Sequence, residues 1–189
     1  MASLVLSGDT SGAITVSAPA VSGSNTQTLV AVTGTLAPIV AATAQASTSG
    51  TSIDFTGIPS WVRRITVMFG AVSTSGSSNF LIQLGDAGGI ETTGYDSSAE
   101  YGGTAAASSS GAIVRNIGAS DNNIGSVVFS LLGSNRWIGF GVIRPIVAGG
   151  TGGVCASSKT LSDTLDRVRI TTVNGTDTFD NGSINILYE

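Results

Sequence analysis

The sequence predicts an all-β protein, an antiparallel β-sandwich of jelly-roll-like type preceded by an extended, β-rich N-terminal segment. Short runs of β-branched and aromatic residues alternate with clusters of Gly, Ser, Asn and Asp, as strands alternate with turns. No stretch has the 3.6-residue apolar period of a convincing amphipathic helix. Charged residues make up 11% of the chain and glycines number 26, which favours a β protein with many tight turns and a hydroxyl-rich surface.

Residues 1–50 differ in composition from the rest and are interpreted as an extended oligomerisation segment. They contain three short alternating runs that are expected to be strands: Ser3–Leu6, Ala13–Ser17 and Thr28–Val32. Strands this short do not form a stable sheet alone, so we expect neighbouring copies of the chain to supply their partners. The Ala/Thr-rich run Pro38–Ala46 admits a short helix, and residues 45–52 are typical of a flexible linker.

Residues 51–189 are predicted to form the sandwich domain. The expected strands are Ile53–Thr56, Arg63–Val72, Asn79–Leu84, Ala112–Ile117, Gly125–Leu132, Arg136–Ile146, Thr164–Val173 and Ser183–Tyr188. The fifth and sixth of these are expected to form a hairpin through residues 133–135. Gly139 and Gly141 inside the sixth indicate a bulge or a close backbone approach. Two stretches of small residues, Thr104–Gly111 and Ala148–Lys159, are expected to be loops.

Charge and composition exclude several classes of function. The formal net charge is −4, so the chain lacks the positive surface that nucleic-acid binding needs, and we expect no nucleic-acid partner. No run reaches the roughly 18 apolar residues of a membrane span. The chain has no histidine, which excludes Ser-His-Asp, Cys-His and His-based zinc sites. Cys155 is the only cysteine and is expected to be a buried or half-buried thiol; we expect no cofactor and no metal.

Two blocks of the sequence resemble parts of known structural proteins. The block GIPSWVRRITVMFGAVSTSGSSNFLIQLGDAGGIETTGY, residues 57–95, is similar to a β module that recurs in tail-fibre and other structural proteins of tailed bacteriophages. The preceding block SGAITVSAPAVSGSNTQTLVAVTGTL, residues 11–36, resembles the low-complexity segment that often precedes that module. Together the resemblance runs from Gly8 to Tyr95, about half of the chain.

The resemblance implies a virion protein, homotrimeric, whose partners are other copies of itself and other tail or capsid proteins. It implies neither catalytic nor receptor-binding residues. Full-length tail fibres are much longer than this chain of 189 residues, so a short fibre, a head fibre or a capsid decoration protein is implied instead.

Aromatic and acidic side chains in the polar stretch after residue 94 are the candidate binding site for a host-surface polysaccharide. Tyr95 and Tyr101 could stack on sugar rings, while Asp96 and Glu100 could accept hydrogen bonds from hydroxyl groups. Trp61 and Trp137 could also stack, but for Trp61 burial in the core or in a subunit interface is favoured.

Other polar groups are interpreted mainly as structural. Asp86 and Glu91 could form the carboxylate pair of a glycan hydrolase, as could Asp96 and Glu100, but turn-forming and solvent-facing roles are favoured. Arg63 and Arg64 should point to opposite faces of a strand, where solvation is favoured over an intersubunit ion pair. The oxygen-rich groups Asp121, Asn122, Asn123 and Asp177, Asp180, Asn181 lack the spacing of known calcium loops, so Asx turns are favoured.

Three hypotheses for function follow. The first is a short trimeric fibre or spike of a phage virion, whose residues 1–50 dock to the particle and whose residues 51–189 bind a host-surface glycan. The second is a decoration or cement protein that stabilises the capsid by strand addition. The third, ranked last, is a carbohydrate-active enzyme that uses Asp86 and Glu91.

Overall fold

The computed structural model describes residues 3–7, 12–17, 37–116, 118–119, 121–147 and 150–189. The chain divides into two compact units, residues 1–36 and residues 37–189. The sequence placed this boundary at residue 50, because the Gly/Ser/Thr-rich run before Thr51 is typical of a linker. The structure assigns residues 37–50 to the second unit.

The described part of the first unit is an antiparallel hairpin of two strands. β1 (Ser3–Ser7) pairs with β2 (Ala13–Ser17), and Val5 lies opposite Thr15. Both strands were expected from the sequence, and they pair with each other within one chain. The third expected strand, Thr28–Val32, lies outside the described residues.

The larger sheet of the second unit runs along one side of a sandwich. Within the described residues it has nine strands, all antiparallel to their neighbours. In spatial order they are β10 (Thr104–Ser108), β9 (Tyr95–Tyr101), β14 (Gly153–Thr160), β13 (Arg136–Pro145), β12 (Asn123–Gly133), β6 (Arg64–Thr74), β16 (Phe179–Tyr188) and β3 (Val40–Ala41), with β4 (Gln45–Ala46) also paired to β16.

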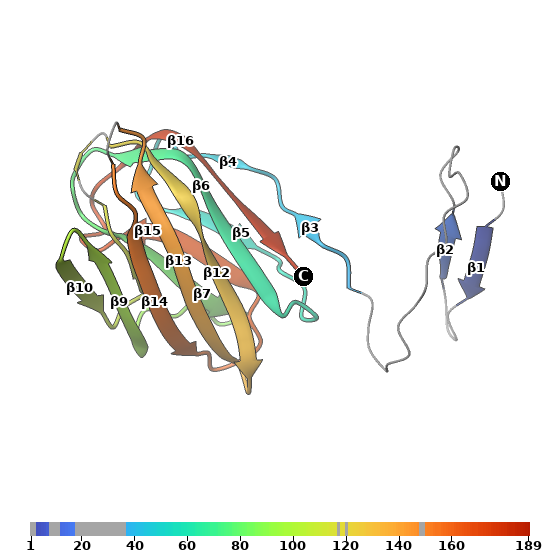
Figure 1. Ribbon diagram of the computed structural model, residues 1–189. Helices are drawn as coiled ribbons and strands as arrows, with labels where there is room; N and C mark the ends of the chain where they lie inside the picture. Colours follow the sequence, from blue (N-terminus) through green and yellow to red (C-terminus); the bar gives the residue numbers. More distant parts are fainter. Residues whose placement is uncertain (1–2, 8–11, 18–36, 117, 120, 148–149) are drawn as a thin grey trace. The chain divides into compact units, whose positions relative to one another are not determined.

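The smaller sheet lies behind the larger one in Figure 1 and completes the sandwich. Its five strands in the described part of the chain are β11 (Ala112–Val114), β7 (Phe80–Asp86), β15 (Arg167–Thr172), β5 (Ile53–Thr56) and β8 (Gly89–Ile90), the last beside β7. The described residues contain no helix. The predicted all-β sandwich is therefore confirmed, while jelly-roll connectivity stays a prediction.

Inward-facing side chains of the two sheets form one apolar core. Strand alternation buries Ile53 and Phe55 of β5 and exposes Asp54 and Thr56 between them, as expected for a strand with one buried face. The larger sheet contributes Ile65, Val67, Phe69, Val127, Phe129, Trp137, Phe179, Ile184 and Ile186. The smaller sheet contributes Phe80, Ile82, Leu84, Val114, Val168 and Ile170.

The hairpin of β12 and β13 has the turn and the close approach that its glycines predict. Ser134 and Asn135 both have positive φ, 48° and 57°, as the central residues of a type I′ turn do. A Cβ atom on Gly141 would lie 2.3 Å from the carbonyl oxygen of Ser126, so only glycine fits there. The close approach proposed for Gly141 is confirmed.

Two of the expected loops are strands, and so is the expected helix. β10 lies within Thr104–Gly111, and β14 occupies most of Ala148–Lys159. Pro38–Ala46 contains the short strands β3 and β4, which add to the edge strand β16 instead of forming a helix. These three segments are rich in Ala, Ser and Thr, which have only weak intrinsic preferences for strand or helix. Backbone hydrogen bonding to a neighbouring strand therefore determines their structure.

Candidate functional site

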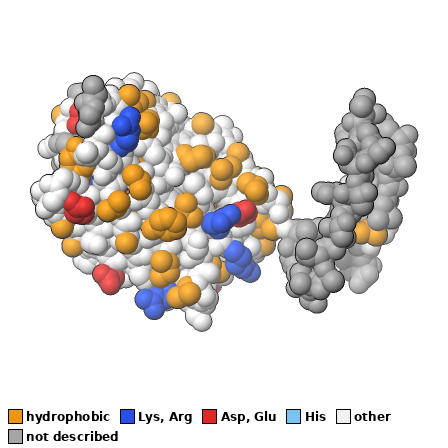
Figure 2. Space-filling view, viewed as in Figure 1, with side chains coloured by type: hydrophobic (Ala, Val, Ile, Leu, Met, Phe, Trp, Pro, Cys, Tyr) orange, Lys and Arg blue, Asp and Glu red, His pale blue; other side chains and the backbone are white. Residues whose placement is uncertain are grey.

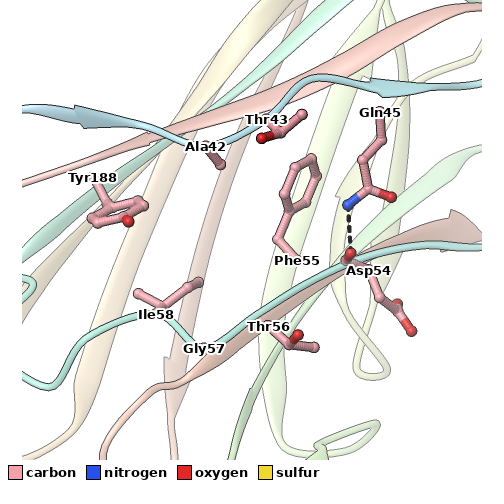
Figure 3. A pocket seen from close by; sticks show the side chains of 9 residues that line it. All are labelled: Ala42, Thr43, Gln45, Asp54, Phe55, Thr56, Gly57, Ile58 and Tyr188. Atoms are coloured by element: carbon pink, nitrogen blue, oxygen red, sulfur yellow. Dashed lines mark hydrogen bonds between the residues drawn. The ribbon is translucent and has the colours of Figure 1, made fainter.

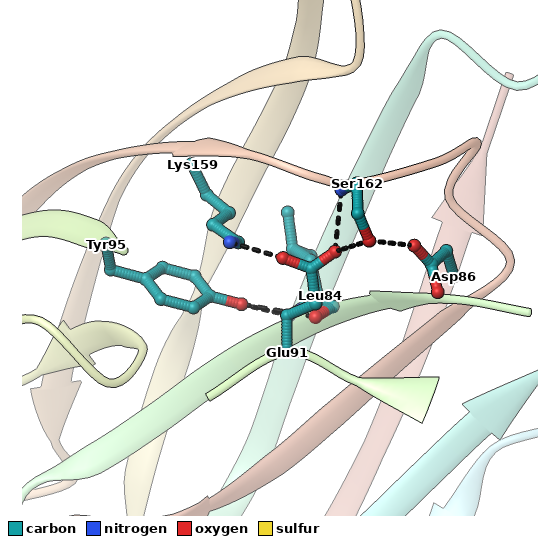
Figure 4. Close-up of polar contacts among 6 residues, drawn as sticks. All are labelled: Leu84, Asp86, Glu91, Tyr95, Lys159 and Ser162. Carbon is teal, nitrogen blue, oxygen red and sulfur yellow. Dashed lines mark hydrogen bonds and ion pairs between the residues drawn. The ribbon is translucent and has the colours of Figure 1, made fainter. Parts of the chain in front are cut away.

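A cluster of polar side chains lies at one end of the sandwich, where β7, β8 and β14 end close together (Figure 4). We call it the serine–carboxylate cluster; its members are Asp86, Glu91, Tyr95, Lys159 and Ser162. Asp86 ends β7, Glu91 directly follows β8, and Lys159 lies near the end of β14. Gly89 has a φ of 132° and permits the tight reversal that brings Glu91 back beside Asp86.

Ser162 bridges the two carboxylates. Its Oγ lies 2.7 Å from Asp86 Oδ2 and 2.7 Å from Glu91 Oε1, so its single hydroxyl proton is shared between the two carboxylates. Its backbone N–H donates to the same Glu91 oxygen at 2.7 Å. Glu91 also forms an ion pair with Lys159, whose side chain is only 7% exposed. The Lys159 ammonium nitrogen lies 5.4 Å from the centre of the Tyr95 ring.

The electrostatics of this cluster favour two ionised carboxylates. The Ser162 hydroxyl and the Gly88 N–H lower the pKa of Asp86, against the opposing effect of burial. Burial raises the pKa of Glu91, but the ion pair with Lys159 and the two bonds from Ser162 outweigh it and lower the pKa overall. A glycosidase needs a carboxyl group of raised pKa and an open space between its two carboxylates. Here both pKa values are lowered and Ser162 lies between the groups, so the geometry favours a structural role.

The cluster predicts a loss of stability in acid. Both carboxylates have a lower pKa in the folded than in the unfolded chain, so they stabilise the fold above the unfolded pKa of about 4 and cease to do so as pH falls through their folded pKa. Ser162→Ala should reduce stability at pH 7, and its difference from the unmodified chain should shrink between about pH 5 and pH 3. Urea unfolding of both chains across this range is the measurement. A difference that stays constant with pH would show that the Ser162 bonds do not depend on ionised carboxylates.

The residues predicted to bind glycan do not converge on one surface. All four lie on β9, where alternation turns Tyr95 inward and Asp96 and Glu100 outward. Tyr95 is 5% exposed, and its hydroxyl bonds to the backbone N–H and carbonyl of Leu84, at 2.6 and 3.2 Å. Burial raises the pKa of that hydroxyl. Tyr95 therefore cannot stack on a sugar, although Asp96 and Glu100 remain exposed and Tyr101 is half-buried.

The other aromatic and sulfur groups occupy structural positions. Trp137 is buried in the core. Trp61 is 37% exposed in this chain, so its expected burial in the core is wrong, while burial in a subunit interface stays a prediction. Its ring packs against Tyr188 with ring centres 6.0 Å apart. Cys155 is half-buried, and burial raises the pKa of its thiol to about 11, so the thiolate nucleophile is scarce near neutral pH.

The oxygen-rich segments carry turn-forming bonds. Asn174 Oδ1 accepts bonds from the backbone N–H groups of Thr176 and Asp177, and Asp177 Oδ2 accepts from that of Ser78. Asn123 is fully buried and donates to the Val72 carbonyl. The described residues contain no group of three or more potential metal-ligating His, Cys, Asp or Glu side chains.

Arg63 and Arg64 both remain at the surface. Arg63 precedes β6 and donates to the carbonyls of Ser60 and Val62, at 2.9 and 3.0 Å. Arg64 begins β6 and pairs with Glu189 of its own chain.

A shallow groove separates the strap formed by residues 42–45 from β5 (Figure 3). Its volume is about 280 Å³, and Phe55, Ile58 and Tyr188 supply its apolar lining. Gln45 Nε2 spans it and donates to the backbone carbonyl of Asp54 at 2.6 Å. This contact ties the strap to the edge of the smaller sheet.

A second pocket of about 360 Å³ includes the outer face of β5 and β15. We call it the arginine pocket; it is lined by Asp54, Thr56, Gly89, Ile90, Thr92, Arg167 and Arg169. Arg169 lies opposite Asp54, and Arg167 lies opposite Thr56, in the register of the two strands. Strand β8 (Gly89–Ile90) pairs with the end of β7, and a Cβ atom on Gly85 of β7 would lie 2.2 Å from the Gly89 carbonyl oxygen.

Each guanidinium in the arginine pocket is held by a carboxylate. Arg169 Nε and Nη2 each lie 2.7 Å from an oxygen of Asp54, and Arg167 forms a similar fork with Asp166 at 2.6 and 3.1 Å. The bonds to Asp166 and Asp54 raise the pKa of Arg167 and Arg169 respectively. A guanidinium has five N–H donors, so each arginine keeps three after forming its fork. The pocket thus presents fixed donors and acceptors with little net charge.

Sequence reasoning missed the arginine pocket because it depends on a pairing between distant strands. Alternation does place Asp54 and Thr56 on one polar face and Arg167 and Arg169 on another. Nothing in either run indicates that β5 and β15 are neighbours.

Comparisons with protein-family models, with curated proteins and with solved structures found no match to this chain. Among the described residues there is no long apolar helix of the kind that crosses a bilayer.

Proposed function

We propose that this chain is a structural attachment protein of a tailed-phage virion, a short homotrimeric fibre or spike that binds a neutral saccharide of the host surface in the arginine pocket. The resemblance of residues 8–95 to phage fibre proteins supports the virion assignment. The single observation that supports binding is the pair of Asp–Arg forks around an open pocket. The protein acts by binding, without catalysis.

The chemistry of the arginine pocket favours a neutral polyol. Sugar hydroxyl groups both donate and accept, so they can bond at once to the free lone pairs of Asp54 and the free N–H groups of Arg169. A phosphate or carboxylate would meet Asp54 in the pocket lining, and the charge of Arg167 is already offset by its pairing with Asp166, which reduces the attraction. Ile90 adds an apolar surface for the C–H face of a sugar ring.

The expected result is that neutral hexoses bind this pocket. Titrating methyl glycosides of glucose, galactose and mannose, together with N-acetylglucosamine, should shift the backbone amide NMR signals of residues 54, 90, 167 and 169. Asp54→Asn should weaken binding at least about tenfold, because it removes a charged acceptor and releases Arg169. Asp163→Asn is the matched control, since Asp163 is an exposed carboxylate outside the pocket.

Two outcomes would contradict saccharide binding at this pocket. One is that none of these sugars shifts the pocket signals. The other is that inorganic phosphate or glucuronate binds there while the neutral sugars do not, which would indicate an anion site.

Antibody labelling of intact particles tests the virion assignment separately. Label at the tail, or on fibres that project from the head, supports a fibre or spike. Label spread evenly over the head surface would instead support the cement protein, and particles without label would contradict both roles.

A further inference from the structure

At its centre, strand β13 has large side chains on the solvent side of the larger sheet and glycines on the inward side. Its inward positions alternate Trp137, Gly139, Gly141 and Ile143, whereas Ile138, Phe140 and Val142 point outward. Phe140 is 63% exposed and Val142 is 51% exposed. A sheet face that meets water normally carries polar side chains, so this strand has the opposite pattern at its centre.

This outward pattern is fixed by the packing beneath it. A Cβ atom on Gly139 would lie 2.5 Å from the Phe129 ring, and one on Gly141 would lie 2.8 Å from Val127 Cγ2. The space inside β13 is therefore already filled by β12 side chains. A register shift that turned Phe140 inward would bring two larger side chains into that space, so Phe140 is held outside.

Neighbouring strands extend the apolar surface, which we call the outer patch. Val154 of β14 lies directly opposite Val142, and Val128 of β12 lies opposite Phe140. The members of the outer patch are Val128, Ile138, Phe140, Val142, Val154 and Ala156. Figure 2 views this side of the sandwich, where hydrophobic side chains lie across the middle and charged ones nearer the margins. A contiguous exposed patch of this kind marks an interaction surface.

Charged side chains of both signs flank the outer patch. Asp96 and Glu100 project from β9 on one side, and Arg136 and Arg144 project from the two ends of β13. β14 separates the acids from the arginines. None of the four ion pairs found among the described residues involves these side chains.

We propose that copies of this chain associate with one another through the outer patch, with the β9 acids of one copy facing the β13 arginines of the next. In the sheet register Glu100 is level with Val142, one outward position from Arg144, and Asp96 is level with Ile138, one outward position from Arg136. In a cyclic assembly whose axis is parallel to these strands, equivalent residues of all copies lie at the same height along the axis. Each acid of one copy therefore comes within one outward position of an arginine of its neighbour. The same sheet face therefore carries both the acids and the arginines of the proposed contact. A second copy of this chain is thus the partner whose charges match it.

The outer patch and its flanking charges occupy part of the larger sheet. The four strands from β9 to β12 span about 15 Å across and β13 spans about 30 Å along, which gives on the order of 450 Å² per copy. A standard protein–protein interface buries about 800 Å² per partner, so a stable assembly requires neighbouring strands of the same sheet to be buried as well. The proposal names the surface behind the self-assembly included in the proposed function, and it does not depend on saccharide binding.

Analytical ultracentrifugation of the full chain over a range of concentrations tests the surface. The unmodified chain should form a discrete oligomer, and Phe140→Ser should weaken association at least about tenfold. Val173→Ser is the matched control, because Val173 is 51% exposed but follows β15 in the smaller sheet. An oligomer that persists unchanged in Phe140→Ser, or an unmodified chain that stays monomeric throughout, would overturn the proposal, even if another virion protein proved to cover the patch.

Charge reversal tests the proposed pairing. Asp96→Arg with Glu100→Arg should weaken assembly, and so should Arg136→Glu with Arg144→Glu, because each places like charges opposite each other. All four changes in one chain should restore assembly, and a lack of restoration in a folded chain would refute the pairing. Saccharide titration of the monomeric Phe140→Ser chain separates the two proposals, since lost assembly and lost sugar binding are then measured independently.

Discussion

Replacing Phe80 with alanine is expected to lower the free energy of unfolding by about 3–5 kcal/mol. Phe80 lies on β7 of the smaller sheet and is fully buried. Its ring centre lies 5.6 Å from that of Phe69 and 6.3 Å from that of Phe179, both on the larger sheet. Truncation therefore opens a cavity between the two sheets, where three aromatic rings meet, and the surrounding strands cannot close it.

Phe140→Ala is the matched control, because it deletes the same atoms from a side chain that is 63% exposed. Measured on the unassociated chain, it should change stability by no more than about 0.5 kcal/mol. Urea unfolding followed by tryptophan fluorescence compares the two variants. Equal losses would mean that Phe80 and Phe140 are buried to the same extent, contrary to the sandwich described here.

Much of the fold follows from local pattern because strongly patterned strands carry their own signal. Ile53–Thr56 alternates apolar and polar residues and is a strand with those bounds. The hairpin of β12 and β13 is marked by β-branched and aromatic runs on both sides of Ser134 and Asn135. In such segments side-chain propensity, alternation and turn chemistry agree, so neighbours are not needed to predict the structure.

Three of the missed strands are next to one another in space. β9, β10 and β14 form one flank of the larger sheet and consist mainly of Ser, Ala and charged residues. Their strand structure comes from backbone pairing with β13 and with each other, which local propensity does not encode. The same cause explains the wrong prediction for Tyr95, which could be recognised as inward-facing only once β9 was known to be a strand. The binding roles of Asp96, Glu100 and Tyr101 stay predictions.

At the candidate sites too, contacts between residues close in sequence could be considered in advance, whereas contacts between distant segments could not. Asp86 and Glu91 are close in sequence, so a carboxylate pair could be considered from the sequence, although turn-forming and solvent-facing roles were favoured. Lys159 and Ser162, which hold Glu91 in place, come from a segment about seventy residues away, so they could not be linked to it. The arginine pocket and the outer patch likewise depend on strand order, which the sequence leaves open.

Replacing Lys159 with methionine is expected to lower the free energy of unfolding by about 2–3 kcal/mol at pH 7. The Lys159 side chain is 7% exposed and pairs with Glu91, whose side chain is 21% exposed. Methionine preserves the packing of the lysine stem but leaves the Glu91 carboxylate without its counter-charge. Partial exposure of Glu91 to water places the loss below the range for a fully buried pair. Chemical denaturation gives the loss directly.

The double variant Lys159→Met with Glu91→Gln should recover part of the loss, because no unpaired charge then remains in the cluster. Arg64→Met is the matched control: it breaks the ion pair with Glu189, but the Arg64 side chain is 56% exposed, and such surface pairs contribute about 0–1 kcal/mol. If the cluster has a structural role, Lys159→Met should lower the free energy of unfolding by more than Arg64→Met does. If Lys159→Met instead left stability unchanged while abolishing a hydrolytic activity towards glycans, Asp86 and Glu91 would have to be reconsidered as catalytic groups.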